Sequence, residues 1–238
     1  MTLSDLEVLA YSESPIGAIC LRRRALPGAT GDVVTEITVD HMLLMSSHHT
    51  ASERALARCA LERHDGADLR VLIGGLGLGY TAREVLDSPA VARVDAIELL
   101  PQVVGWMRNG LVPLSEELNA DARLRVIEAD VYALLASPPE RQYDLILVDV
   151  DHSPDEPLAE ANGAFYGQEG LSKVKRHLAP GGLLGVWSYA DCEPFVRNLR
   201  AVFPRVEVER VVFDNILTNE SETNWVFLAY ESADSGEG

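Results

Sequence analysis

The sequence predicts an α/β protein built on a doubly wound, mostly parallel sheet with an antiparallel edge strand, preceded by a small N-terminal β unit. From residue 70 onward, short apolar runs alternate with helical patterns, which is typical of a parallel sheet covered on both faces. The first apolar run stops at four glycines within six positions. The last two runs have no helix between them, so they are expected to pair antiparallel at the sheet edge.

The elements are expected in the following order. Residues 16–24 and 33–39 predict a hairpin, because Pro27-Gly28 and Gly31-Asp32 between them are turn formers. A helix is predicted over 51–63. The strands of the main sheet are expected near 70–74, 92–97, 123–127, 143–149, 181–187, 205–213 and 224–231. The helices between them are expected near 79–87, 100–110, 130–136, 164–178 and 191–203.

The charge of the chain limits its function. The 238 residues include 37 acidic and 20 basic side chains, for a formal net charge of −17. A protein that binds nucleic acid through its phosphates needs a basic surface, and Arg22-Arg23-Arg24 is the one basic run here. That run suits a solvated strand edge or a dimer rim. The acidity would attract a cationic substrate, or serve solubility.

Cysteine usage and hydropathy give three further expectations. Cys20, Cys59 and Cys192 lie far apart, which argues against a disulfide framework and against a zinc or other metal site. The longest apolar runs fall short of the roughly 18 residues that a membrane span needs. The first residues lack the basic and apolar regions of a signal peptide, so a cytoplasmic protein is expected.

The glycine loop predicts a nucleotide site. Gly74, Gly75, Gly77 and Gly79 follow a buried strand and precede a helix. Glycine adopts positive φ and has no Cβ, so such a turn brings bare backbone against a ligand. Glycine turns also end ordinary strands, which is the alternative.

Acids follow the next two strands, where ligands bind in such sheets. Glu98 ends the second strand about 20 residues past the loop, a position that suits hydrogen bonds from ribose hydroxyls. Its alternative role is to cap the helix that begins near Pro101. Asp130, after the third strand, could accept a bond from an adenine amino group beside the Val131 amide, or act as an N-cap. Both roles of Asp130 can hold at once.

The fourth strand ends in Asp149-Val150-Asp151-His152, the strongest candidate for chemistry. Asp149 could anchor an amine or act as a base, with Asp151 beside it, and His152 could shuttle a proton near neutral pH. The alternative is a polar loop of turn-forming residues. Trp187 ends the fifth strand and is expected to wall the pocket.

The order of these motifs resembles the Rossmann-like class I S-adenosylmethionine-dependent methyltransferase fold. More narrowly, roughly residues 12–231 resemble the spermidine synthase (polyamine aminopropyltransferase) group. By that resemblance the four glycines would surround the methionine-like part of the donor, Glu98 would hold the ribose and Asp130 the adenine. Asp149 would help to deprotonate the attacking amine. The resemblance implies S-adenosylmethionine or its decarboxylated form as donor, a small-molecule acceptor such as an amine, and a homodimer.

The chain then divides into three parts. Residues 1–50 form the N-terminal β-hairpin unit, 51–231 the Rossmann-like nucleoside-binding catalytic domain, and 232–238 a tail whose composition predicts disorder.

The sequence departs from the family at three places. The family loop usually reads Gly-Gly-Gly-Asp-Gly-Gly, and its aspartate meets the aminopropyl nitrogen, whereas this loop reads Gly-Gly-Leu-Gly-Leu-Gly. The second gate aspartate is matched by His152. The family's Tyr-His-Glu corresponds to Ala51-Ser52-Glu53, so its tyrosine is absent.

These departures order the functional hypotheses. Alkyl transfer from S-adenosylmethionine or a derivative leads, with methyl transfer slightly ahead of aminopropyl transfer from the decarboxylated donor. A catalytically inactive nucleoside-binding homologue is the third hypothesis. A nicotinamide dehydrogenase is the weakest, since the chain offers no second substrate domain.

Overall fold

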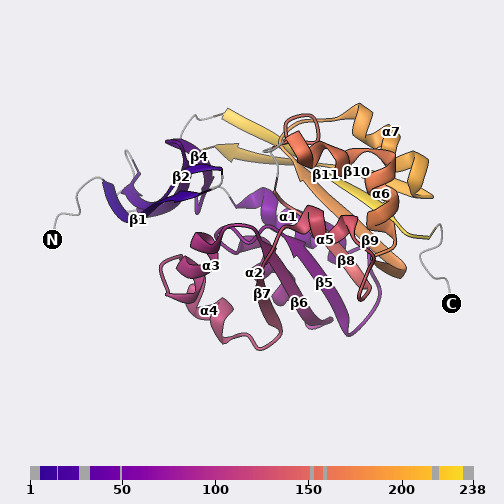
Figure 1. Ribbon diagram of the computed structural model, residues 1–238, viewed down its shortest axis with the longest axis horizontal. Helices are drawn as coiled ribbons and strands as arrows, with labels where there is room; N and C mark the ends of the chain where they lie inside the picture. Colours follow the sequence, from indigo (N-terminus) through magenta and orange to yellow (C-terminus); the bar gives the residue numbers. More distant parts are fainter. Residues whose placement is uncertain are drawn as a thin grey trace.

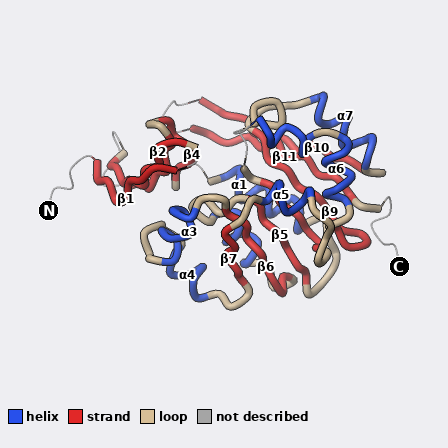
Figure 2. The backbone as a smooth tube through the Cα atoms, viewed as in Figure 1, coloured by secondary structure: helices blue, strands red, loops and turns tan. Residues whose placement is uncertain are grey.

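A computed structural model describes residues 6–14, 16–26, 33–48, 50–150, 153–157, 160–215 and 220–232. Within these residues the chain forms a four-stranded sheet and a seven-stranded sheet (Figure 1). The smaller sheet projects from one side of the larger one, and helices cover the larger sheet (Figure 2).

The N-terminal sheet is an antiparallel meander. Its strands, in spatial as well as chain order, are β1 (Leu6–Ser14), β2 (Gly17–Ala25), β3 (Val33–Val39) and β4 (Met42–Ser46). The predicted pairing of β2 with β3 is confirmed. The sequence analysis missed β1 and β4. In β4, four of the five residues are apolar, so the strand lacks the alternation of apolar and polar residues that would indicate it. Asp40 and His41 both have positive φ and close the tight turn between β3 and β4.

The large sheet has the order β10-β11-β9-β8-β5-β6-β7. Its strands are β5 (Leu69–Gly74), β6 (Val91–Glu98), β7 (Leu124–Glu128), β8 (Tyr143–Val148), β9 (Leu178–Ser188), β10 (Arg205–Asn215) and β11 (Glu220–Tyr230). Strands β5 to β9 pair in parallel, whereas β11 is antiparallel to both β9 and β10. The predicted sheet and its antiparallel edge are therefore confirmed. The strand order reverses between β5 and β8, which is where ligands bind in such sheets.

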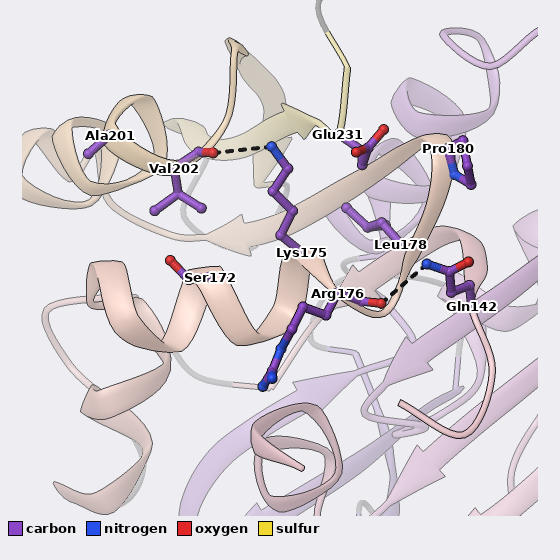
Figure 3. A pocket seen from close by; sticks show the side chains of 9 residues that line it. All are labelled: Gln142, Ser172, Lys175, Arg176, Leu178, Pro180, Ala201, Val202 and Glu231. Atoms are coloured by element: carbon purple, nitrogen blue, oxygen red, sulfur yellow. Dashed lines mark hydrogen bonds between the residues drawn. The ribbon is translucent and has the colours of Figure 1, made fainter. Parts of the chain in front are cut away.

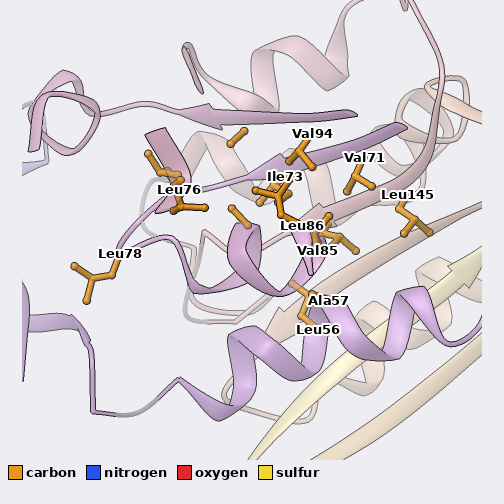
Figure 4. Close-up of a cluster of buried hydrophobic side chains, with 14 of the residues drawn as sticks. Leu56, Ala57, Val71, Ile73, Leu76, Leu78, Val85, Leu86, Val94 and Leu145 are labelled. Carbon is orange, nitrogen blue, oxygen red and sulfur yellow. The ribbon is translucent and has the colours of Figure 1, made fainter. Parts of the chain in front are cut away.

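Helices cover both faces. They are α1 (Ala51–Leu61), α2 (Tyr80–Leu86), α3 (Pro101–Arg108), α4 (Ser115–Ala120), α5 (Val131–Ala136), α6 (Gln168–Lys175) and α7 (Glu193–Val202). Side chains alternate along β5: Val71 and Ile73 join the core under α1 and α2, whereas Leu72 joins the core under α5 to α7. Figure 4 shows part of the first core, where Leu56 of α1 and Val85 of α2 lie near Ile73.

The helices differ from the sequence prediction in two places. The helix expected over 164–178 is a 3-10 helix, Glu160–Tyr166, followed by α6. Gly167 separates them in an extended conformation, with φ −81° and ψ 162°. Helix α4 was not predicted, since its six residues show too little periodicity. Residues 233–238, most of the tail predicted to be disordered, lie outside the described residues.

In the part of the chain that the structure describes, helices long and apolar enough to cross a membrane are absent.

Candidate active site

A cavity of about 580 Å³ lies at the carboxyl ends of the parallel strands. Its walls come from the glycine loop, the first turn of α1 and the ends of β6 to β9. The N-terminal sheet and the β10–β11 hairpin, which extends toward that sheet, complete the lining (Figure 1). Segments that are far apart in sequence therefore meet around one space.

Gly75 and Gly77 line the cavity. Gly75 has φ +92°, and a Cβ there would collide with the backbone carbonyl of Asp149. A Cβ on Gly77 would collide with the side chain of Met45 from β4. Bare backbone is thus needed where the loop meets the segment after β8, and Met45 of the N-terminal sheet lies against the loop.

Gly74 and Gly79 lie behind the loop and are not among the residues that line the cavity. A Cβ on Gly74 would press on Val131, and one on Gly79 would press on Leu118 and Met107. The structure therefore gives these two glycines a packing role, and their predicted contact with the donor stays a prediction.

Glu98 lines the cavity and is 7% exposed. Its Oε2 accepts a 2.9 Å hydrogen bond from the amide of Leu76, and its Oε1 accepts one of 2.9 Å from the amide of Leu100, just before α3. The carboxylate thus binds the glycine loop to the start of α3. The alternative capping role is present, and the ribose role stays a prediction.

Asp130 is the N-cap of α5 and lines the cavity together with Val131. Its Oδ1 accepts hydrogen bonds from the amides of Tyr132, at 2.8 Å, and Ala133, at 3.2 Å. Both bonds use one oxygen, so the second oxygen can still accept a bond from an adenine amino group.

Asp149 follows β8 and lines the cavity. Thr81 Oγ1 donates a 2.9 Å hydrogen bond to its Oδ2. Burial raises the pKa of the Asp149 carboxyl to about 6, and the bond from Thr81 partly opposes that rise. A carboxyl with such a pKa can take up or release a proton close to neutral pH.

A second carboxylate, Glu53, lines the same cavity from the first turn of α1. Ser52 Oγ donates a 2.9 Å hydrogen bond to its Oε2. Burial raises the pKa of Glu53 to about 7, and the negative charge of Asp149 raises it further in the same direction. Sequence reasoning aligned Glu53 with a family glutamate but gave it no role, because only folding brings α1 to the end of β8.

Asp151 and His152, both predicted to be catalytic, lie outside the described residues. In the described part of the same loop, Asp155 and Glu156 accept hydrogen bonds from the segment after β9. Tyr189 Oη donates a 2.6 Å hydrogen bond to Glu156 Oε2, and Cys192 Sγ donates one of 3.1 Å to Asp155 Oδ2. Neither loop acid is among the residues that line the cavity.

The strands beyond the switch point supply the remaining wall. Trp187 of β9 lines the cavity, which confirms its predicted place. Phe213 of β10 and Glu222 and Asn224 of β11 also line it, and sequence reasoning missed all three. No local motif marks them, because they face the cavity only through the pairing of the hairpin.

The charge of the lining is one-sided. Its described residues include five carboxylates, from Glu53, Glu98, Asp130, Asp149 and Glu222, and no lysine, arginine or histidine. The three cysteines, Cys20, Cys59 and Cys192, are free.

A second hollow, of about 520 Å³, lies at the opposite end of the sheet, where β8 and β9 begin (Figure 3). Lys175 and Arg176 line it. Lys175 Nζ donates a 3.4 Å hydrogen bond to the carbonyl of Val202, and Gln142 Nε2 donates one of 3.4 Å to the carbonyl of Arg176.

Residues 49–201, more than half of the chain, match the family model of the spermine/spermidine synthase domain. The chain belongs to the spermine/spermidine synthase family. The match runs from the start of α1 into α7 and therefore contains the glycine loop, Glu53 and Asp149.

Curated relatives agree with this family. The chain is 41% identical over 123 residues to polyamine aminopropyltransferase 2 of Streptomyces coelicolor, which covers 51% of this chain and 22% of that protein. It is 29% identical over 180 residues to polyamine aminopropyltransferase 2 of Pseudomonas aeruginosa, which covers 73% of this chain and 49% of that protein. The chain thus matches half or less of the length of these relatives.

Solved structures share the fold. A spermidine synthase in complex with the transition-state analogue AdoDATO superposes with a TM-score of 0.75 at 21% identity, covering 95% of this chain and 74% of that one. The spermidine synthase of Thermotoga maritima gives a TM-score of 0.74 at 20% identity over the same shares. These likenesses confirm the predicted Rossmann-like fold with its N-terminal β unit.

Proposed function

We propose that this protein transfers an aminopropyl group from decarboxylated S-adenosylmethionine to an amine. The observation that carries the proposal is the one-sided charge of the cavity: five carboxylates and no basic side chain among its described lining residues. The family match supports the same reaction class.

The charge of the lining discriminates between the two donors. Decarboxylated S-adenosylmethionine carries a sulfonium and an ammonium group and no anion. The intact donor adds a carboxylate, which would enter an acidic cavity whose described lining offers no cationic side chain to pair with it. The cavity therefore favours the decarboxylated donor. This reverses the order of the sequence analysis, which placed methyl transfer slightly ahead because of the three departures from the family pattern.

The residues predicted to bind the donor would act as follows. The aliphatic part of the donor would pack against the backbone of Gly75 and Gly77, where no side chain is in the way. Glu98 would accept hydrogen bonds from the ribose hydroxyls, and Asp130 one from the adenine amino group, since both residues line the cavity.

Asp149 and Glu53 would handle the proton of the acceptor amine. When bound, the donor supplies a carbon already activated by its sulfonium sulfur. The lone pair of the acceptor nitrogen bonds to that carbon, the carbon–sulfur pair stays on sulfur as a thioether, and the nitrogen's proton passes to a carboxylate. A carboxyl pair whose pKa values lie near 6 and 7 suits that proton transfer at neutral pH.

Methyl transfer to an amine is the second candidate. The chain is 28% identical over 140 residues to putrescine N-methyltransferase 2 of Nicotiana attenuata, which covers 56% of this chain. A loop without an acid also suits a donor whose amino group does not need that partner. An amine acceptor is common to both candidates, whereas the predicted homodimer and cytoplasmic location remain predictions.

Calorimetric titration with each donor tests the proposal, followed by mass spectrometry of the products formed with putrescine. We expect tighter binding of the decarboxylated donor and a product heavier by one aminopropyl group. A methylated product from the intact donor would favour the second candidate. Binding without any product would indicate an inactive nucleoside-binding homologue.

A further inference from the structure

The Asp149 carboxylate is held by a side chain from behind the cavity wall. Thr81 is the second residue of α2 and is 5% exposed. Its Oγ1 donates the 2.9 Å hydrogen bond to Asp149 Oδ2, but Thr81 is not among the residues that line the cavity. We therefore expect Thr81 to act on a ligand through Asp149.

Two other hydroxyls at helices bond within their own helix. Ser172 of α6 donates a 2.7 Å hydrogen bond to the carbonyl four residues before it, and Ser137, just after α5, donates one of 2.9 Å in the same pattern. This is the local bond that serine and threonine hydroxyls make in helices. Thr81 bonds instead to the segment after the neighbouring strand β8. A hydroxyl has one hydrogen to donate, so this bond replaces the local one.

The glycine loop and α2 together fix both the backbone and the side chain of Asp149. The Asp149 amide donates a 2.9 Å hydrogen bond to the carbonyl of Gly74, and the Asp149 carbonyl lies where a Cβ of Gly75 would be. Thr81 then holds the carboxylate by Oδ2. The other oxygen, Oδ1, can take a proton.

The groups around Asp149 differ in their effect on its charge. The glycine loop presents backbone, α2 presents the Thr81 hydroxyl, and α1 presents the titratable Glu53, whose own hydroxyl partner is the adjacent Ser52. The bond from Thr81 favours the ionised carboxylate and so lowers the pKa of Asp149, against the rise caused by burial. Without this bond Asp149 would keep its proton to higher pH.

We propose that Thr81 is a positioning residue, whose hydroxyl holds the Asp149 carboxylate ionised and leaves Oδ1 to take the proton of the acceptor amine. This inference rests on the proposed function. The proton passes from the nitrogen to Oδ1 as the nitrogen–carbon bond forms, and the carbon–sulfur pair stays on sulfur. Thr81 keeps its own proton throughout.

Initial-rate measurements across pH test this role. Thr81→Val keeps the shape of the side chain without the hydroxyl, and kcat at neutral pH should fall roughly tenfold because a hydrogen bond to a charged group is lost. The acid limb of the kcat/KM profile should move to higher pH, so part of the lost rate returns as the pH is raised. Thr81→Ser should restore both the rate and the profile. Ser172→Ala removes a helix hydroxyl with a local bond and is the matched control, with no expected change.

The outcomes separate the positioning role from the reaction. An unchanged rate and pH profile in Thr81→Val would overturn the role and leave the proposed function standing. A loss that is equal at every pH, and that Thr81→Ser does not restore, would overturn it in favour of packing alone. Thr81→Ala gives the same comparison if Thr81→Val does not fold.

If the wild type transfers nothing, the proposed function fails, and a carbon-13 NMR titration of the Asp149 carboxyl still decides the role of Thr81. Asp149→Asn identifies the resonance. A higher pKa in Thr81→Val supports the inference that Thr81 holds the carboxylate ionised, and an equal pKa overturns it.

Discussion

The two ends of the large sheet carry hollows of similar volume and opposite character. The carboxyl-end cavity, of about 580 Å³, is lined by five acids and no bases among its described residues. The amino-end hollow, of about 520 Å³, is lined by Lys175, Arg176 and one acid, Glu231. At the amino end, the amide of Gly181 donates a hydrogen bond to the Glu231 carboxylate, and Lys175 donates one to the carbonyl of Val202, so these groups serve local structure.

This difference shows that the candidate site is formed by the segments that meet at the carboxyl ends of the strands, and not by the sheet alone. At the carboxyl end, the glycine loop, α1, the N-terminal sheet and the β10–β11 hairpin all meet. At the amino end, the lining comes from α6, α7, the start of β9 and the residues just before β8 and just after β11. Buried carboxylates are costly without partners, so an acidic cavity is best explained by a cationic ligand.

The largest expected effect is at Asp149. Asp149→Asn keeps the bond partner of Thr81 but removes the proton acceptor, so kcat should fall roughly 10²- to 10⁴-fold. Lys175→Met, at the other end of the sheet, should leave kcat unchanged. Initial-rate measurements on both variants check this contrast, and an equal loss in the two would show that the cavity is not the reacting site.

Alanine substitutions of two glycines, one at each end of the large sheet, test how closely other atoms approach the backbone there. Gly75 and Gly181 both have positive φ, but a Cβ on Gly75 meets the Asp149 carbonyl, whereas one on Gly181 meets open space. Gly181→Ala should cost about 1–2 kcal/mol of unfolding free energy from its backbone conformation. Gly75→Ala should cost about 1–3 kcal/mol more from the collision and should weaken donor binding. Urea denaturation and calorimetry test both; equal losses of stability would contradict the contact.

The acidic cavity should also respond to pH in two opposite ways. The pKa of Glu53 is raised from 4.5 to about 7 and that of Asp149 from 3.8 to about 6. Across these windows the folded chain binds more protons than the unfolded chain, so stability should fall as pH rises. Affinity for a cationic donor should rise over the same range, because the carboxylates ionise.

Glu53→Gln and Asp149→Asn should each flatten both pH profiles. Thermal melts and donor titrations from about pH 4 to about pH 8 would reveal this, since each group titrates within that range. Lys175→Met should retain both slopes. Profiles that stay unchanged in the two cavity variants would refute the assignment.

Two substitutions of Asp130 distinguish its role in capping α5 from a role in binding the donor, and the expected change in stability is smaller than at Gly75. Asp130→Ala removes the N-cap of α5 and should cost about 1 kcal/mol of stability. Asp130→Asn keeps a capping oxygen, so stability should stay close to that of the wild type. Both should weaken donor binding if the carboxylate holds the adenine, and unaltered donor affinity in both would argue against that role.

The smallest effect is expected at the amino-end hollow. Lys175 Nζ lies 5.6 Å from the centre of the Phe203 ring and donates one long hydrogen bond. Lys175→Ala should therefore change stability by less than about 1 kcal/mol. A larger loss, or a change in donor affinity, would give this hollow a role that its geometry does not indicate.

Much of the fold and part of the site could be predicted from the sequence. Local patterns specified the strands of the large sheet, because a buried parallel strand needs an unbroken apolar run. The acids at or just after the ends of those strands, Glu98, Asp130 and Asp149, line one cavity, and their roles toward a ligand stay predictions. Gly74 and Gly79 were assigned to the donor, but side chains distant in sequence pack behind them. The loop sequence shows where a turn occurs but not which of its faces is covered.

The sequence by itself determined the sheet, its glycine turn and the acids at its strand ends, since each depends on residues within one short segment. Only the tertiary structure placed Glu53, Glu222 and Asn224 around the same cavity as Asp149, because α1 and β11 reach it through long-range packing. Two of these residues, Glu53 and Glu222, add carboxylates to the lining of the cavity. The charge of a cavity is a sum over all the segments that meet there, and no single segment contains that sum.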